Sequence, residues 1–341
     1  MADLGVKFPS FLPPEASHLK EQAARIMASR IKRLPVTTEL SASPILTSCV
    51  TPGVIRSNAS PLLLLHGFDS SCLEWRRAFP LLEDAGLEPW AVDILGWGFS
   101  SSERKISSYG AKAKTRHLYD FWRSHIRRPA TVVGPSLGGA VAIELAATYP
   151  EMVSKLVLID AQGYAEGLGN LTTSPRSLLY AGAAVLKSVP LRAYANLLIF
   201  KGLNYSSLMD LIRVGRLHCL MPGWADALVD FMISGGYNVV SQIPQVDKET
   251  LLIWGERDTI VPTFNAEVRY LLTFYFLFPL VFFSFQKFLV DLPNSRLEII
   301  SDCGHIPHVE KPTAVADSLS RFLKDGPDLA SAGTSSLSVS L

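Results

Sequence analysis

The chain has 341 residues, a formal net charge of +1 and a hydrophobic content of 48%. That length suffices for one large domain with an insertion or for two ordinary domains. Because neither a basic excess nor a nucleic-acid-binding motif is visible, we expect no nucleic acid as a partner. The four cysteines lie far apart without a CxxC pair, which favours free thiols in a reducing compartment.

The N-terminal extension, residues 1–44, carries an amphipathic pattern. Its first 20 residues lack the apolar stretch of a secretory signal and are not rich in Ser and Arg. We therefore expect an intracellular protein of the cytoplasm or plastid. Apolar residues recur at roughly helical spacing over 17–34, which predicts a basic amphipathic helix docked on the body. Binding to a membrane surface is the alternative for this helix.

From residue 45 onwards, short apolar runs that end in turn residues alternate with helical patterns. Examples of the runs are "PLLLLHGF", "EPWAVDILGWG", "SKLVLIDA", "ETLLIWGERD" and "SRLEIISDCGH". Such runs are typical of buried parallel strands, and their alternation with helices predicts a mostly parallel sheet covered on both faces. We assign the core to residues 45–163 and 246–325. The Ser- and Gly-rich tail, residues 326–341, is predicted to be disordered.

One long segment interrupts this alternation between two predicted core strands. Residues 164–245 contain helical runs such as "SPRSLLYAGAAVLKSV" and "LMDLIRVGRLHCLM". We interpret this mostly helical insertion as a lid, and these residues are called the lid segment.

The strongest chemical signal is "VVGPSLGGA", in which residues 134–138 fit the pattern G-x-S-x-G. A strand precedes this pattern and a helix follows it, which is the context of a nucleophile elbow. The glycines allow a tight turn, and the turn lifts the Ser136 hydroxyl above the edge of the sheet. The Leu137 amide, at the start of the helix, would then point at a developing oxyanion.

A nucleophilic serine needs a base, and the base needs a carboxylate that orients it. Asp258 follows one predicted strand and His305 follows the next. Because open parallel sheets collect their active sites at the carboxyl ends of the strands, Ser136, Asp258 and His305 are expected to meet there. His308 is the alternative base.

The same stretch of chain raises the possibility of a metal ion. Asp302, Cys303, His305 and His308 all have side chains that ligate metals. They lie on one predicted loop, and no distant ligand is evident. We therefore expect no metal and no other cofactor.

The chain resembles the α/β-hydrolase superfamily, in the branch that has a lid between strands, and is most similar to plant epoxide-hydrolase-like hydrolases. The resemblance spans about residues 45–325 and rests on "LLLLHGFDSSCLEWR", "AVDILGWGFSS", "VVGPSLGGAVAIELA", "LLIWGERD" and "DCGHIPHVEKP". The family's histidine–glycine turn matches His66 and Gly67, so the resemblance implies that the Phe68 amide is a second oxyanion donor beside Leu137. It also offers Asp160 as an alternative position for the acid.

The residue at the elbow separates the subfamilies that this resemblance brings together. Epoxide hydrolases and dehalogenases of this fold use aspartate there, whereas this chain has Ser136. The resemblance therefore implies a serine carboxylesterase or lipase-like hydrolase of a small or lipid-like ester, with a Ser-His-Asp triad and no cofactor. The alternative is a small-molecule receptor of the same fold with slow turnover or none.

An uncharged run, "YLLTFYFLFPLVFFSFQ" at residues 270–286, separates Asp258 from His305. It is shorter than the roughly 20 residues that span a membrane, contains a proline, and is apolar on every side. Without residues 268–286 the chain reads as a plain helix that leads into a strand. We therefore interpret 268–286 as an insertion from a retained intron or a gene-model error. The alternative is a membrane contact through 270–286.

Overall fold

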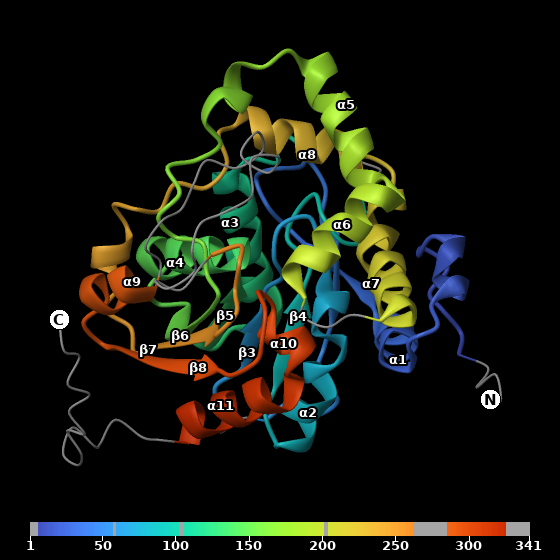
Figure 1. Ribbon diagram of the computed structural model, residues 1–341. Helices are drawn as coiled ribbons and strands as arrows, with labels where there is room; N and C mark the ends of the chain where they lie inside the picture. Colours follow the sequence, from blue (N-terminus) through green and yellow to red (C-terminus); the bar gives the residue numbers. More distant parts are fainter. Residues whose placement is uncertain (1–5, 57–58, 102–105, 201–203, 262–284, 325–341) are drawn as a thin grey trace.

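The computed structural model describes residues 6–56, 59–101, 106–200, 204–261 and 285–324, and within these ranges eight strands form one sheet (Figure 1). The strand order is β1-β2-β4-β3-β5-β6-β7-β8, with antiparallel pairing of β1 with β2 and of β2 with β4 and parallel pairing elsewhere. The strands are β1 Lys32–Val36, β2 Ile45–Val50, β3 Leu62–Leu64, β4 Pro89–Val92, β5 Ala130–Pro135, β6 Val153–Ile159, β7 Thr250–Gly255 and β8 Ser295–Ile300. The predicted mostly parallel sheet is confirmed.

Helices lie on both faces of this sheet, as the sequence pattern predicts. The α-helices of the described residues, including those of the lid segment, are α1 Gln22–Arg30, α2 Ala78–Asp84, α3 Ala111–Phe121, α4 Leu137–Thr148, α5 Arg176–Lys187, α6 Val189–Ile199, α7 Tyr205–Leu217, α8 Trp224–Ile233, α9 Phe285–Asp291, α10 Pro307–Glu310 and α11 Pro312–Lys324. Figure 1 shows α2 and α11 on one side of the sheet and α3 and α4 on the other.

The central strands β3 and β4 bury both of their faces, which explains their continuous apolar sequences. In β3, Leu62 and Leu64 pack into the cluster that holds α1, α2 and α11. Leu63 packs into the cluster that holds α3, α4 and α8. Since successive side chains of a strand point to opposite faces, every residue of such a strand must be apolar. Each fully buried leucine contributes about 1.5–3 kcal/mol to this packing.

The N-terminal region differs from its prediction. The helix expected over 17–34 is shorter, because α1 spans only Gln22–Arg30, and Lys32–Val36 form strand β1. Since β1 pairs with β2, a boundary at residue 44 separates β1 from the sheet to which it belongs. The apolar spacing over the last residues of 17–34 fits an edge strand as well as a helix. Pro35 lacks an N–H group and is tolerated at such an edge.

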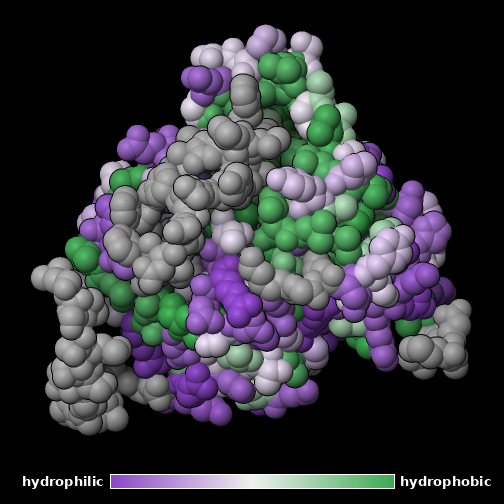
Figure 2. Space-filling model, in the orientation of Figure 1, coloured by the Kyte–Doolittle hydropathy of each residue, from purple (hydrophilic) through white to green (hydrophobic). Residues whose placement is uncertain are grey.

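The lid segment contains α5, α6, α7 and α8, which follow β6 and precede β7 in the chain. In Figure 1 these helices lie beyond the end of the sheet, and Figure 2 shows apolar surface over α5 and α6. The exposed apolar side chains there are Leu178, Tyr180, Val185, Val189, Tyr194 and Leu197. Within the described ranges no helix is long and apolar enough to cross a membrane.

Two expectations fall on residues that lie largely outside the described ranges. The insertion predicted at 268–286 overlaps the description only where α9 begins, at Phe285. The tail predicted to be disordered at 326–341 lies outside the description entirely. Both remain predictions.

We predict that a methyl group at Gly255 destabilises the fold, because the end of β7 there is in direct backbone contact with the loop that follows β8. A Cβ at Gly255 would lie 2.0 Å from the Gly304 carbonyl oxygen. Gly255→Ala should therefore lower the free energy of unfolding by about 1–3 kcal/mol. Gly182 of α5 is the matched control, because a Cβ there would meet no heavy atom within 4 Å outside the backbone of its own helix. Gly182→Ala should stabilise the protein by about 0.5–1 kcal/mol in urea unfolding. Equal effects of the two substitutions would contradict the prediction.

Candidate active site

The turn between β5 and α4 presents Ser136 in an unusual backbone conformation. Ser136 has φ +50° and ψ −121°, in a region that residues with a side chain rarely adopt. A Cβ at Gly134 would lie 2.1 Å from the Gly138 carbonyl oxygen, so only glycine allows the strand and the helix to approach this closely. The Ser136 amide donates to the Ile159 carbonyl oxygen at 2.9 Å, which ties the turn to the neighbouring strand β6.

The structure brings Ser136, His305 and Asp258 together through a continuous chain of hydrogen bonds. His305 Nε2 lies 3.0 Å from Ser136 Oγ, and His305 Nδ1 lies 2.8 Å from Asp258 Oδ2. The His305 and Asp258 side chains are almost completely buried. A proton on Nδ1 that bonds to the carboxylate leaves Nε2 as the acceptor for the serine hydroxyl, which is the arrangement that a general base requires.

The second oxygen of Asp258 is held by the backbone of its own loop. Asp258 Oδ1 accepts hydrogen bonds from the amides of Ile260, at 2.7 Å, and Val261, at 3.1 Å. With the bond to His305, the carboxylate therefore has three donors and a fixed orientation.

Asp160, the alternative acid, lies next to the hydrogen-bonded Asp258 but in a different electrostatic environment. Its Oδ1 accepts a hydrogen bond from the Gly255 amide at 2.9 Å, whereas its buried Oδ2 has no hydrogen-bond partner among the described residues. Complete burial, together with the neighbouring Asp258 charge, raises the pKa of Asp160 well above its ordinary value. Burial thus favours the protonated form of Asp160 relative to that of an exposed aspartate, and Asp258 is the carboxyl group that contacts His305.

The oxyanion turn predicted at residues 66–68 lies directly beside the elbow. A Cβ at Gly67 would lie 3.6 Å from Ser136 Cβ. Burial lowers the pKa of His66, and the neutral ring accepts from the Ile94 amide at Nε2 while Nδ1 donates to the Gly67 carbonyl oxygen at 2.8 Å. Because a trans peptide holds its C=O and N–H antiparallel, this bond fixes the direction of the Phe68 N–H.

His308 is directed to a different partner from His305. Its Nε2 lies 2.9 Å from Glu74 Oε1, and its ring packs on Trp75 with centroids 4.6 Å apart. Glu74 also accepts from the Gly67 amide at 3.2 Å. Burial opposes the charge on Glu74, but the hydrogen bond and charge of His308 lower its pKa to about 2. His308 thus braces the oxyanion turn and does not contact Ser136.

Three of the four metal-ligating side chains noted on the His305 loop, those of Asp302, His305 and His308, have separate partners. Asp302 pairs with Arg257 at 2.7 Å, and His308 pairs with Glu74. A different group of such side chains does converge: ligand atoms of Asp69, His218 and Cys219 lie within 4.8 Å of one another. An arginine, Arg192, already provides the cation for this group, since its guanidinium contacts both Asp69 and Cys219.

Sequence reasoning did not identify the group around Asp69. Asp69 is more than a hundred residues away in sequence from each of its partners, and charged side chains are usually exposed. The one local signal is an aspartate directly after the His-Gly-Phe turn, at a position with φ +48°. The Asp69 side chain is 3% exposed, which shows that it is part of the interior.

Comparisons with known proteins agree with this architecture. A family model described as the alpha/beta hydrolase family matches residues 62–318. The chain is 46% identical over 320 residues to the alpha/beta hydrolase domain-containing protein VTE7 of Arabidopsis thaliana, covering 93% of this chain and 91% of that one. It is 25% identical to lipase 1 of Psychrobacter immobilis, covering 77% of this chain and 76% of the lipase.

Solved structures share the fold at low sequence identity. A thermophilic esterase from Thermogutta terrifontis superposes with a TM-score of 0.63 at 18% identity, covering 86% of this chain and 98% of the esterase. A meta-cleavage product hydrolase from Pseudomonas fluorescens superposes with a TM-score of 0.63 at 20% identity, covering 85% and 97%. The sheet order, the matched family region and the relative in Arabidopsis thaliana together show that this chain belongs to the alpha/beta hydrolase family.

Proposed function

We propose that the protein is a serine hydrolase that cleaves a carboxylic ester through Ser136, His305 and Asp258. The observation that carries the proposal is the hydrogen-bond chain from Ser136 Oγ to His305 Nε2, at 3.0 Å, and from His305 Nδ1 to Asp258, at 2.8 Å. That chain ends in a serine on a strained turn at the head of a helix. The three groups have the chemical types and the order of contacts that activate a hydroxyl as a nucleophile.

In the first half of the reaction, Ser136 Oγ attacks the ester carbonyl carbon while His305 Nε2 takes the hydroxyl proton. Asp258 holds the imidazole in place and stabilises the imidazolium that forms. The amides of Phe68 and Leu137 donate to the tetrahedral oxyanion. His305 then gives its proton to the alcohol oxygen as the C–O bond breaks, which leaves an acyl group on Ser136.

In the second half, water replaces the alcohol. His305 takes a proton from the water as its oxygen attacks the acyl carbon, and the same two amides stabilise the second oxyanion. Collapse of this intermediate returns the proton to Ser136 and releases a carboxylic acid. The proposed chemistry uses only side chains and backbone amides of this chain.

A small or lipid-like ester suits the surroundings of the site. The Phe68 ring contacts Trp97 and Phe231, with ring centroids 5.5 and 6.5 Å apart, so aromatic carbon lies beside the oxyanion turn. The outer surfaces of α5 and α6 also carry exposed apolar side chains (Figure 2). Both features favour a substrate with an apolar acyl or alcohol group.

Ser136→Ala should abolish labelling by a fluorophosphonate probe and lower kcat on p-nitrophenyl butyrate by about 10³-fold or more, because no other residue replaces the nucleophile. Ser17→Ala is the control, since Ser17 is exposed and bonds only to a local carbonyl oxygen. A Ser136→Ala variant that hydrolyses the ester at the wild-type rate would refute the proposal. A wild-type burst without steady-state turnover would instead favour the receptor alternative.

The two neighbouring carboxyl groups should respond differently to the same substitution. Asp258→Asn should lower kcat by about 10⁴-fold, because the amide favours the wrong imidazole tautomer. Asp160→Asn should lower kcat less than tenfold, since Asp160 has no hydrogen bond to His305 among the described residues and the asparagine oxygen can still accept from the Gly255 amide. Steady-state kinetics of both variants on p-nitrophenyl butyrate measures the ranking. The reverse order would transfer the role of the acid to Asp160.

Asp160 should also make stability depend on pH. The pKa of Asp160 is raised in the folded state. Its contribution to stability is therefore fully present below the unfolded-state pKa of about 4 and is lost as pH rises through the folded-state pKa. Within that window the wild-type protein should lose up to about 1.4 kcal/mol per pH unit from this group. Asp160→Asn removes the titration, so its stability relative to wild type should increase from pH 5 to pH 9. Urea unfolding at pH 5, 7 and 9 tests this, and parallel curves would contradict it.

A further inference from the structure

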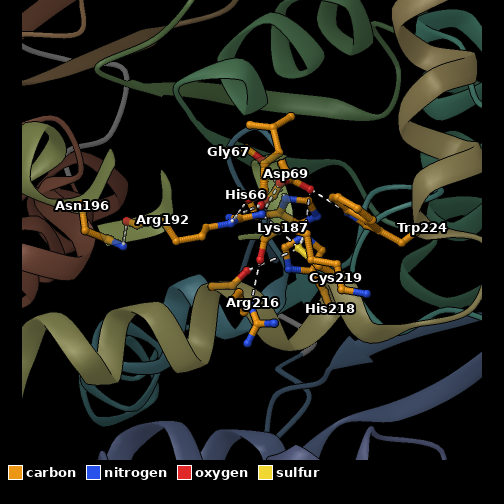
Figure 3. Close-up of polar contacts among 12 residues, drawn as sticks. His66, Gly67, Asp69, Lys187, Arg192, Asn196, Arg216, His218, Cys219 and Trp224 are labelled. Atoms are coloured by element: carbon orange, nitrogen blue, oxygen red, sulfur yellow. Dashed lines mark hydrogen bonds and ion pairs between the residues drawn. The ribbon is translucent and has the colours of Figure 1, made fainter. Parts of the chain in front are cut away.

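Among the described residues, the side-chain partners of a buried carboxylate next to the oxyanion turn, that of Asp69, all come from the lid segment (Figure 3). Asp69 Oδ1 accepts from Trp224 Nε1 at 2.7 Å and lies 3.0 Å from His218 Nε2. Asp69 Oδ2 accepts from Arg192 Nη2, and Arg192 Nη1 reaches the Asp69 carbonyl oxygen at 3.4 Å. Trp224 lies on α8, His218 in the turn after α7, and Arg192 on α6.

Inside the protein, the Asp69 carboxylate lies against cationic partners. Burial opposes ionisation of Asp69, but the charges of Arg192 and His218 hold its pKa well below the ordinary range. Burial would also lower the pKa of His218, but the Cys219 sulfur and the Asp69 carboxylate raise it to about 10. The bonds to Asp69 are therefore charge-assisted, and removal of one partner leaves a buried charge unpaired.

The contacts around Phe68 are divided between the body and the lid segment. On the body side, His66 and Glu74 hold the carbonyl and the amide of Gly67. On the other side, Asp69 has a φ of +48°, a conformation that costs energy unless its surroundings enforce it. The side-chain partners of Asp69 all come from the lid segment. The Phe68 amide thus lies between one anchor in the body and one in the lid segment.

We propose that Asp69 is a positioning residue whose carboxylate, held by Arg192 and its lid neighbours, fixes the Phe68 amide for the oxyanion. The oxyanion hole is then complete only while α6 and α8 are docked on the body. This inference rests on the proposed serine hydrolase function and adds to it a link between the lid segment and transition-state stabilisation. The lid segment would then help to position the Phe68 amide as well as line the substrate site.

Asp69→Asn tests the proposal with a nearly unchanged shape, because asparagine also tolerates a positive φ. Loss of the charge weakens the bonds to Arg192 and His218. We expect kcat on p-nitrophenyl butyrate to fall about 10- to 100-fold, while KM changes less than about threefold, since the amide acts mainly in the transition state.

Arg192→Lys is the second variant. It keeps the positive charge but loses the planar fork that reaches both the side chain and the backbone of Asp69. It should lower kcat by a smaller factor than Arg192→Met. The matched control is Arg213→Met, because Arg213 lies on α7 of the same lid segment and pairs with Asp210 of its own helix at 2.7 Å, away from Asp69. That control should keep wild-type kinetics.

A transition-state analogue separates positioning from a general loss of structure. An alkyl trifluoromethyl ketone forms an oxyanion on the serine, whereas the matching alkyl amide does not. In Asp69→Asn the affinity for the ketone should fall in parallel with kcat/KM, while the affinity for the amide stays within about twofold. Near-ultraviolet circular dichroism and urea unfolding verify the fold. If Asp69→Asn fails to fold, Trp224→Phe carries the test, because it removes one donor and keeps an aromatic ring.

Unchanged kcat and ketone affinity in folded Asp69→Asn and Arg192→Met would overturn the inference. A higher KM at constant kcat would also overturn it, because the group would then serve substrate binding alone. Either outcome leaves the proposed function intact as long as wild-type protein turns over the ester and Ser136→Ala does not. Loss of turnover in wild type itself would instead count against the proposed function.

Discussion

The positive φ of Ser136 is the backbone constraint on which the rest of the site depends. Such a conformation costs a residue with a side chain roughly 1–2 kcal/mol, so neighbouring packing must enforce it. The enforcement comes from backbone contact between Gly134 and Gly138 and from the hydrogen bond between the Ser136 amide and the Ile159 carbonyl oxygen. The first contact brings α4 against the end of β5, and the second exists because β5 and β6 are adjacent parallel strands. The sheet thus presents the hydroxyl and the first turn of α4 at one fixed point.

The buried carboxyl groups around the active site differ in the number and the charge of their hydrogen-bond donors. Asp258 has two amides and an imidazole, Asp69 has two cationic side chains and an indole, and Asp160 has a single amide. Glu74 is stabilised by His308 and by the Gly67 amide. The partners of Asp69 and Glu74 lower the pKa of these two groups, whereas burial and the neighbouring Asp258 raise the pKa of Asp160. This division leaves one carboxylate in contact with the base and places the others where they brace loops.

The sequence was sufficient to predict the sheet, its helical layers and the convergence of Ser136, Asp258 and His305. Those predictions depend on local patterns: apolar runs that end in turn residues, and a glycine-flanked serine between a strand and a helix. The end of α1 at Arg30 could not be predicted, because the apolar spacing of the following residues fits an edge strand equally well. The group around Asp69 was also out of reach, since its partners are distant in sequence and meet only when the lid segment docks.

The central claim is that Ser136 forms a covalent acyl intermediate, and trapping that intermediate tests it most directly. Wild-type protein mixed with p-nitrophenyl butyrate would be quenched in acid during the first turnover, digested and examined by mass spectrometry. The account predicts one butyryl group on the peptide that contains Ser136, attached at that serine, and none in Ser136→Ala. Ester hydrolysis without an acylated peptide, or a butyryl group on another residue with the same kinetics, would contradict it.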